Sequence, residues 1–142
     1  MTADLYGAAP NAEAFVRAWL LPLATEVSLV GSARWTAGMG LPYRAVTRLG
    51  GESDLIADTA ALRVHTFADT YTEASREADR THRRMLLLGL DPLAEVTLAG
   101  GITASCSSLD RATGPAEQPY GAETVVTRFI SDYTLTLRFA PA

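Results

Sequence analysis

The residues able to do chemistry are few, and they are scattered along the chain. His65 and His82 are the only histidines, and Cys106 is the only cysteine. A protein zinc site takes about four nitrogen, sulfur or carboxylate ligands at short spacings, and neither histidine has an acidic partner at such a spacing. Asp54 and Asp58 are close enough in sequence to form a carboxylate pair, but acids beside a strand more often form turns. These patterns predict no metal site and no catalytic pair.

The glycine pairs do not form a phosphate-binding loop either. Neither Gly50-Gly51 nor Gly100-Gly101 is followed by the lysine and hydroxyl residue of such a loop or by a spaced third glycine. Gly31-Ser32 lacks the second glycine of a nucleophile elbow. Cys106 has no base near it in sequence, so a buried, unreactive thiol is expected. We therefore expect a protein that is not an enzyme and has no cofactor.

Residues 61–90 contain the clearest local signal, a strand that leads directly into a helix. Thr70 and Glu73 have the spacing of a capping box, in which the two side chains satisfy amides of the first helical turn. Apolar residues then recur with helical spacing between charged ones. Gly89 predicts the end of the helix, and Pro92 prevents its continuation.

The other predicted elements lie on both sides of this unit. Asn11 is expected to cap a first helix that ends near Leu21. Strands are expected over residues 27–35, 43–49, 102–109 and 128–139, and Gly50-Gly51 is expected to end the second of them. The last strand alternates most clearly between apolar and polar residues, and the irregularity at Ile130 and Ser131 predicts a bulge.

Two segments are expected to lie outside the regular structure. Residues 1–10 are predicted to be a flexible lead-in, and residues 110–123 a long loop, because they contain two prolines, two glycines and few apolar anchors. The order of elements is then roughly αβββαββ. This order predicts a single α+β domain over residues 1–142, with two main helices packed against a mostly antiparallel or mixed β-sheet.

Composition limits the partners and the compartment. The 142 residues carry a net charge of -4, and all 12 basic residues are arginine, so the chain has no basic field that would attract nucleic acid. The first residues lack the basic start and apolar run of a signal peptide, and no apolar run is long enough to span a membrane. We therefore expect a soluble domain that is made without export.

The arrangement of residues along the strands and helices resembles a known family. The chain is similar to the tail terminator (tail completion) proteins of long-tailed, non-contractile bacteriophages, the siphoviruses, particularly those that infect actinobacteria. The resemblance covers most of the chain beyond residue 10. The residues that carry it are Leu41-Pro42, Val46, Arg48, Gly50-Gly51, Asp58, Phe67-Ala68, Glu73-Ala74, Gly114-Pro115, Pro119, Val126, Arg128, Phe129, Tyr133 and Leu135 to Arg138.

This resemblance implies a structural protein of the virion. Such a protein forms a hexameric ring that caps the tail tube, stops its polymerisation and joins the head-side connector or stopper protein. Its partners would be further copies of itself, the tail tube protein and the connector, with DNA only passing through the channel. It would be found in the host cytoplasm during assembly and then at the head-proximal end of the tail. Two alternatives remain: a head-completion or stopper protein of the neck, and a small ligand-binding or enzyme domain.

Charged strand residues are the candidates for contacts in such a ring. Alternation predicts that Arg44 and Arg48 share one face, and that Arg128 and Arg138 share one. We expect these arginines to pair with Asp54, Asp58 or Glu123 across the subunit or tube interface, because guanidinium groups bind carboxylates in a fork. Contact with DNA in the channel is the alternative, and solvated side chains that contribute little to stability are a third reading.

Overall fold

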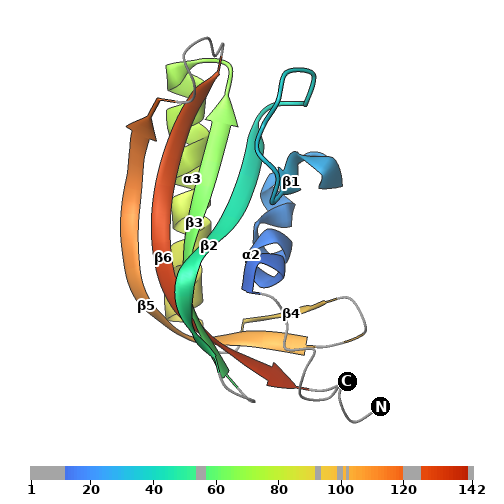
Figure 1. The fold of residues 1–142 in the computed structure, drawn as a ribbon, viewed down its shortest axis with the longest axis vertical. Helices are drawn as coiled ribbons and strands as arrows, with labels where there is room; N and C mark the ends of the chain where they lie inside the picture. The colour runs from blue at the N-terminus through green and yellow to red at the C-terminus, as the bar shows by residue number, and fades with distance from the viewer. Residues whose placement is uncertain are drawn as a thin grey trace.

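A computed structural model describes residues 12–53, 57–91, 94–98, 101, 103–119 and 126–140 of the chain. It shows a six-stranded sheet in the order β1-β2-β3-β6-β5-β4, in which β1 is parallel to β2 and all other neighbours are antiparallel. Two helices accompany the sheet (Figure 1). The elements are α2 (Ala12–Leu20), β1 (Val30–Gly31), β2 (Tyr43–Ser53), β3 (Ala57–Ala68), α3 (Tyr71–Leu90), β4 (Glu95–Thr97), β5 (Thr103–Gln118) and β6 (Thr127–Ala140). The predicted α+β class is confirmed, with the short β4 as an additional strand.

Both helices cover the same face of the curled sheet. The main core lies between them and the strands, and it includes Phe15 from α2, Met85 and Leu88 from α3, and Leu135 from β6. The other face carries no helix in the described part of the chain, and in Figure 1 its strands lie in front of α3. We call this second surface the helix-free face.

The two helices are joined by a reciprocal contact. The indole nitrogen of Trp19 donates to the carbonyl of Arg84 at 2.9 Å, and Nε of Arg84 donates to the carbonyl of Trp19 at 2.7 Å. The guanidinium also lies 4.1 Å from the centre of the Trp19 ring, where the face of an indole attracts a cation. Because the contact uses both main chains, it fixes the position of α2 along α3.

The start of α3 is confirmed, and its end differs by one residue. The side-chain oxygen of Thr70 accepts a hydrogen bond from the amide of Glu73 at 3.2 Å, as an N-terminal cap requires. The helix continues through Gly89 to Leu90. A Cβ on Gly89 would lie 3.4 Å from Cβ of Leu109, an ordinary van der Waals distance, so the end of α3 lies against β5 at this residue. Asn11, the predicted cap of the first helix, lies outside the described residues.

The prediction of a loop at residues 110–123 is wrong for the part that the structure describes. β5 continues to Gln118 and pairs with β6 as far as Arg128. Its register shifts three times, and the last shift places Gly114 and Pro115 between the pairs Thr113–Asp132 and Ala116–Ile130. A bulge in an edge strand tolerates proline because no ladder partner needs its missing amide. Pairing with the regular strand β6 therefore makes residues 110–118 a strand, although their composition is typical of a loop.

Three further predictions about strands need correction. The bulge expected at Ile130 and Ser131 is absent from β6, which pairs with β3 without a register shift, and the irregularity lies opposite in β5. Gly50 and Gly51 do not end the second strand, which passes through them to Ser53 with a shift after Arg48. Residues 27–35 form a short 3₁₀ turn and the two-residue β1 rather than a long strand. Local composition misplaces these boundaries because pairing with a neighbouring strand decides them.

Candidate functional site

Arg44 lies inside the protein, so its predicted place at a subunit interface is wrong. Its side chain has no exposed surface and is covered by α3. Nε donates to the hydroxyl of Thr81 at 2.7 Å, and Nη2 donates to Oε1 of Glu77 at 2.8 Å. Burial lowers the pKa of Arg44, against the raising effect of the hydrogen bond to Glu77. Arg44 therefore ties β2 to α3 within one subunit.

Glu77 is the centre of this buried cluster. It also accepts two hydrogen bonds from Nη1 of Arg80, at 2.8 and 3.1 Å. Burial alone would raise the pKa of Glu77, but the hydrogen bonds and charges of Arg44 and Arg80 outweigh it, and the pKa is lowered. Glu77 is therefore ionised near neutral pH and balances the charge of Arg44.

Arg48 and Asp58 form an ion pair within one chain, whereas they were predicted to pair between subunits. Nη1 and Nη2 of Arg48 lie 2.6 and 2.8 Å from the two carboxylate oxygens of Asp58. The hairpin of β2 and β3 brings the two side chains together on the helix-covered face. The main-chain amide of Arg48 also donates to Glu13 of α2 at 2.8 Å. Arg44 and Arg48 therefore do share a face, but it faces the helices.

Arg128 and Arg138 share the helix-free face, as predicted from alternation. Arg138 is exposed, and Arg128 is partly buried. Nη2 of Arg128 donates to the carbonyl of Pro119 at 2.9 Å and lies 3.4 Å from Oε1 of Gln118. Asp54 and Glu123, the remaining predicted interface residues, lie outside the described residues. Among the described residues that were predicted to lie at an interface, Arg128 and Arg138 are therefore the two on the helix-free face.

The helix-free face also carries an ion pair between Arg63 and Asp132 that was not predicted from the sequence. The two residues are direct partners in the β3–β6 register, and the guanidinium binds both carboxylate oxygens at 2.8 and 3.0 Å. The hydrogen bond from Arg63 lowers the pKa of Asp132. Both residues occupy polar positions in strands where apolar and polar residues alternate, so the sequence does place each of them on the polar face. That they are partners follows only from the register of β3 on β6, which the sequence does not give.

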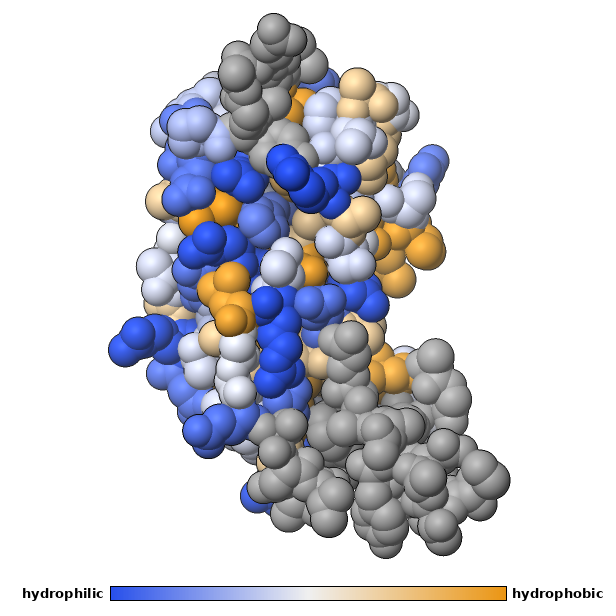
Figure 2. Space-filling model, in the orientation of Figure 1, coloured by the Kyte–Doolittle hydropathy of each residue, from blue (hydrophilic) through white to orange (hydrophobic). Residues whose placement is uncertain are grey.

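The helix-free face is largely polar over β3, β5 and β6, except where Tyr43, Ala45 and Phe67 pack with Trp35 and Val126 in a second apolar cluster. Figure 2, in the orientation of Figure 1, shows mainly hydrophilic side chains over β3, β5 and β6, with isolated apolar ones between them. The register of the strands places threonines 59, 113, 134 and 136 on this face together with Arg63 and Asp132. Because threonine side chains are short, they protrude little from the sheet. Such a face suits contact with water or with another polar surface rather than burial in a core.

The outer edge of β5 is uncovered over most of its length in the described part of the chain. β4 pairs with it only at residues 103–105, and residues 110–114 are all exposed. An unpaired edge presents main-chain donors and acceptors to any chain that approaches. The three register shifts interrupt this edge and make indiscriminate pairing less favourable. A specific neighbour with a matching contour remains able to bind there.

The titratable residues considered for chemistry are separated by the sheet. His65 lies on the helix-free face, near Thr47 and Arg128, whereas Nδ1 of His82 lies 2.8 Å from the hydroxyl of Tyr133 on the α3 side. Cys106 is buried, and burial raises the pKa of its thiol to about 11. Among the described residues, no group of three or more His, Cys, Asp or Glu is placed to hold a metal ion.

The charge state of His65 leads to a prediction about pH. Burial, with the charges of Arg128 and Arg63, lowers the pKa of His65 to about 4, against an opposing effect of Asp132. In the unfolded chain the pKa of His65 is near 6.5, so between pH 6.5 and 4 the unfolded state binds more protons than the folded state. The stability that comes from keeping His65 neutral is therefore complete above pH 6.5 and is lost as the pH falls towards 4. Urea unfolding of wild type and His65→Gln should show a weaker loss in the variant over this range. Parallel pH profiles would contradict the assignment.

Comparison of the sequence with models of protein families and with characterised proteins gave no match. No helix in the described part of the chain has the length and apolar character needed to cross a membrane.

Proposed function

We propose that this chain is a ring-forming tail terminator, which caps the tail tube of a long-tailed bacteriophage and joins it to the head-side connector. The proposal starts from the resemblance of the sequence to that family. Most described residues that carry the resemblance lie in β2, β3 and β6, which are adjacent in the sheet. The similar pattern therefore falls on one contiguous part of the fold.

The observation that carries the proposal is the presence of exposed apolar side chains towards both edges of the sheet. Val27 and Leu49, at 74% and 51% exposure, belong to the β1–β2 side. Leu86, Leu87 and Leu90 are exposed near the end of α3, where Gly89 packs against Leu109 of β5. A closed ring needs two different complementary surfaces on each subunit, since each copy contacts its neighbours head to tail. Surfaces at opposite edges meet this requirement.

The two faces of the sheet also differ, as a protein between a tube and a connector would need. One face is covered by α2 and α3, and the other is polar and carries Arg128 and Arg138. With a net charge of -4, the chain suits contacts with protein better than a strongly basic channel lining. We assign Arg128 and Arg138 to contacts with a neighbouring subunit or the tube, and DNA passes through the channel without specific binding.

Loss of this gene from a phage that carries it should produce tails of irregular and often excessive length that do not join heads. Without a cap, nothing stops further tube subunits from adding to the growing end. Negative-stain electron microscopy of the lysate measures tail lengths and the fraction of tails joined to heads. Expression of the wild-type chain from a plasmid is the control and should restore both.

The same micrographs separate this function from its alternatives. Tails of normal length that fail to join heads would instead assign the chain to the neck, as a head-completion or stopper protein. Normal tails joined to heads would contradict both structural roles and favour a small binding or enzyme domain.

A further inference from the structure

The side of α3 that faces away from the sheet carries an ordered row of exposed side chains, which we call the outer row. It begins with three arginines and ends with two leucines, and its members are Arg76, Arg80, Arg83, Leu87 and Leu90. Successive members are four, three, four and three residues apart, so they form one stripe along roughly 21 Å of the helix at 1.5 Å per residue. This is the spacing at which one helix contacts another along its length.

Two of the three exposed leucines near the end of α3 belong to the outer row. Leu86 does not, because it lies one turn after His82, whose Nδ1 is 2.8 Å from the hydroxyl of Tyr133 and whose Nε2 faces Gly114 of β5. Leu86 therefore points towards the β5 edge. Leu87 and Leu90 point away from the sheet, and Leu90 is 80% exposed. The outer row therefore ends in an apolar surface of its own.

The arginine end of the outer row has more positive than negative charge. One carboxylate, that of Glu77, is shared by three guanidinium groups: those of Arg44 and Arg80 each lie 2.8 Å from Oε1, and that of Arg76 lies 3.7 Å from Oε2. α3 contains four arginines and three acids, and Arg44 beneath it adds a fifth arginine, an excess of two positive charges in a chain of net charge -4.

The guanidinium groups of Arg76 and Arg80 still have donors to offer. Arg76 forms no hydrogen bond with the described residues, and Arg80 uses only Nη1 for its contacts with Glu77. Arg83 is paired with Asp79 at 2.9 Å, so its charge is already balanced. Arg76 and Arg80 are therefore the two members of the outer row that can bind further carboxylates.

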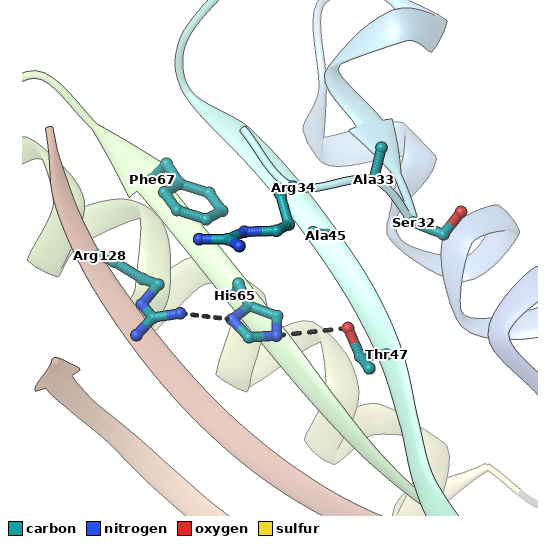
Figure 3. A pocket seen from close by; sticks show the side chains of 8 residues that line it. All are labelled: Ser32, Ala33, Arg34, Ala45, Thr47, His65, Phe67 and Arg128. Atoms are coloured by element: carbon teal, nitrogen blue, oxygen red, sulfur yellow. Dashed lines mark hydrogen bonds between the residues drawn. The ribbon is translucent and has the colours of Figure 1, made fainter. Parts of the chain in front are cut away.

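The arginines of the helix-free face are engaged within the protein. A pocket of about 240 Å³ lies where the segment after β1 passes over β2, and Figure 3 shows the guanidinium of Arg34 between the rings of Phe67 and His65. Nη2 of Arg128, at the same pocket, donates to the carbonyl of Pro119. The outer row of α3 is therefore the better site for a partner.

We propose that the outer row binds an acidic amphipathic helix of another protein, whose apolar residues pack on Leu87 and Leu90 and whose carboxylates bind Arg76 and Arg80. Guanidinium groups present paired donors that match the two oxygens of a carboxylate. Apolar anchors at helical spacing are the usual means by which one protein recognises a helix of another. This inference goes beyond the proposed ring and does not depend on it.

Two other occupants match the outer row less well. Against α3 of a second copy, a parallel arrangement would place arginines opposite arginines, and an antiparallel one would place leucines opposite arginines. Against the phosphates of nucleic acid, the leucine end and Asp79 would contribute nothing favourable. An acidic helix with an apolar stripe is complementary to both ends of the row.

Two synthetic peptides of about 20 residues serve as probes, because helices of this length can form in water. Each carries two glutamates and two leucines at heptad spacing, and their order is reversed between the two peptides so that either chain direction is tested. We expect at least one peptide to give saturable shifts of the amide NMR signals of α3 in the isolated full-length protein. The same peptide with glutamine in place of glutamate should bind about tenfold more weakly, and added salt should weaken only the glutamate form.

Substitutions in the outer row should weaken binding of the glutamate peptide. Arg76→Gln and Arg80→Gln should each cost about threefold in affinity, as expected for partly exposed ion pairs. Leu87→Ser and Leu90→Ser should each cost about fivefold, because each leucine would bury part of its side chain against the peptide. Circular dichroism shows whether each variant is folded; Arg76 forms no hydrogen bond, so its replacement tests the site even if Arg80→Gln is destabilised.

Arg111→Gln and Leu49→Ser are the matched control variants, because both residues are exposed on strands outside the outer row. Leu49 is 51% exposed and Leu87 is 46% exposed, so the two serine variants change similar surfaces. Both controls should bind the peptide as the wild type does.

Equal affinity for the glutamate and glutamine peptides, no saturable shifts with either peptide order, or equal losses in the controls would each overturn the proposal. Tighter binding of a DNA duplex than of the peptide would assign the row to nucleic acid instead. Shifts of the α3 signals with protein concentration alone would assign it to a second copy. Tail lengths after loss of the gene test the proposed function separately, so either idea can fail without the other.

Discussion

Glu77→Ala is expected to lower the free energy of unfolding by about 3–5 kcal/mol, the usual cost of removing one partner from a buried ion pair. The variant leaves Arg44 without exposed surface and without its carboxylate. The Thr81 hydroxyl and the Glu77 carbonyl would remain as acceptors, but neither carries a charge. Thermal unfolding should show a drop in Tm of about 10 °C or more for a chain of this length.

The neighbouring pairs supply the control for this prediction. Arg80→Ala removes the other guanidinium bound to Glu77, but this arginine side chain is 47% exposed, so a change within about 1 kcal/mol is expected. The double variant Arg44→Met and Glu77→Leu should recover much of the lost stability, since apolar residues of similar volume often replace a buried pair without loss. An equal loss in Glu77→Ala and Arg80→Ala would show that burial of the pair is unimportant.

The buried pair also explains why sequence analysis misplaced Arg44. Alternation correctly put Arg44, Val46 and Arg48 on one face, but it could not tell that α3 covers this face at Arg44. Nη1 of Arg44 has no hydrogen-bond partner among the described residues, so the pair is imperfectly satisfied. The geometry of the Arg44–Glu77 pair allows α3 to pack on β2 in only one position. We therefore assign to this pair the role of specifying how α3 is placed on the sheet.

Local signals predicted the elements that are stabilised locally. The capping box at Thr70 and the helical spacing beyond it predicted α3, and the alternation of β6 predicted its inward side chains. The predictions that failed depend on pairing between distant segments. β5 has the composition of a loop beyond Asp110, yet it forms a strand because β6 lies beside it.

The candidate site residues also depend on pairing between distant segments. The ion pair of Arg63 with Asp132 joins two strands whose paired residues are far apart in sequence. Arg48 and Asp58 were predicted as partners because they are opposite in charge, but the hairpin that places them within one chain was missed.

Gly51→Ala is expected to destabilise the protein by on the order of 3 kcal/mol, because both the backbone and the space at this position require glycine. Gly51 has a φ of 129°, a conformation that residues with a side chain rarely adopt. A Cβ here would overlap the carbonyl oxygen of Thr59 and lie 2.9 Å from Cα of Ala60 on the facing strand. Both neighbours are main-chain atoms, so a side-chain rotation cannot relieve the overlap, and the hairpin of β2 and β3 would have to separate locally.

Gly50→Ala is the matched control, since the adjacent glycine is exposed and a Cβ on it would meet no atom within 4 Å. The same substitution there should change the free energy of unfolding by less than about 1 kcal/mol, and restriction of the unfolded chain favours a small gain. Urea unfolding of the two variants, with hydrogen exchange at residues 58–60, compares them directly. Faster exchange in Gly51→Ala alone is expected, because the overlap is with Thr59 and Ala60. Equal stabilities would show that the hairpin tolerates a side chain at residue 51, and its pairing across Gly51 and Ala60 would then contribute little to the fold.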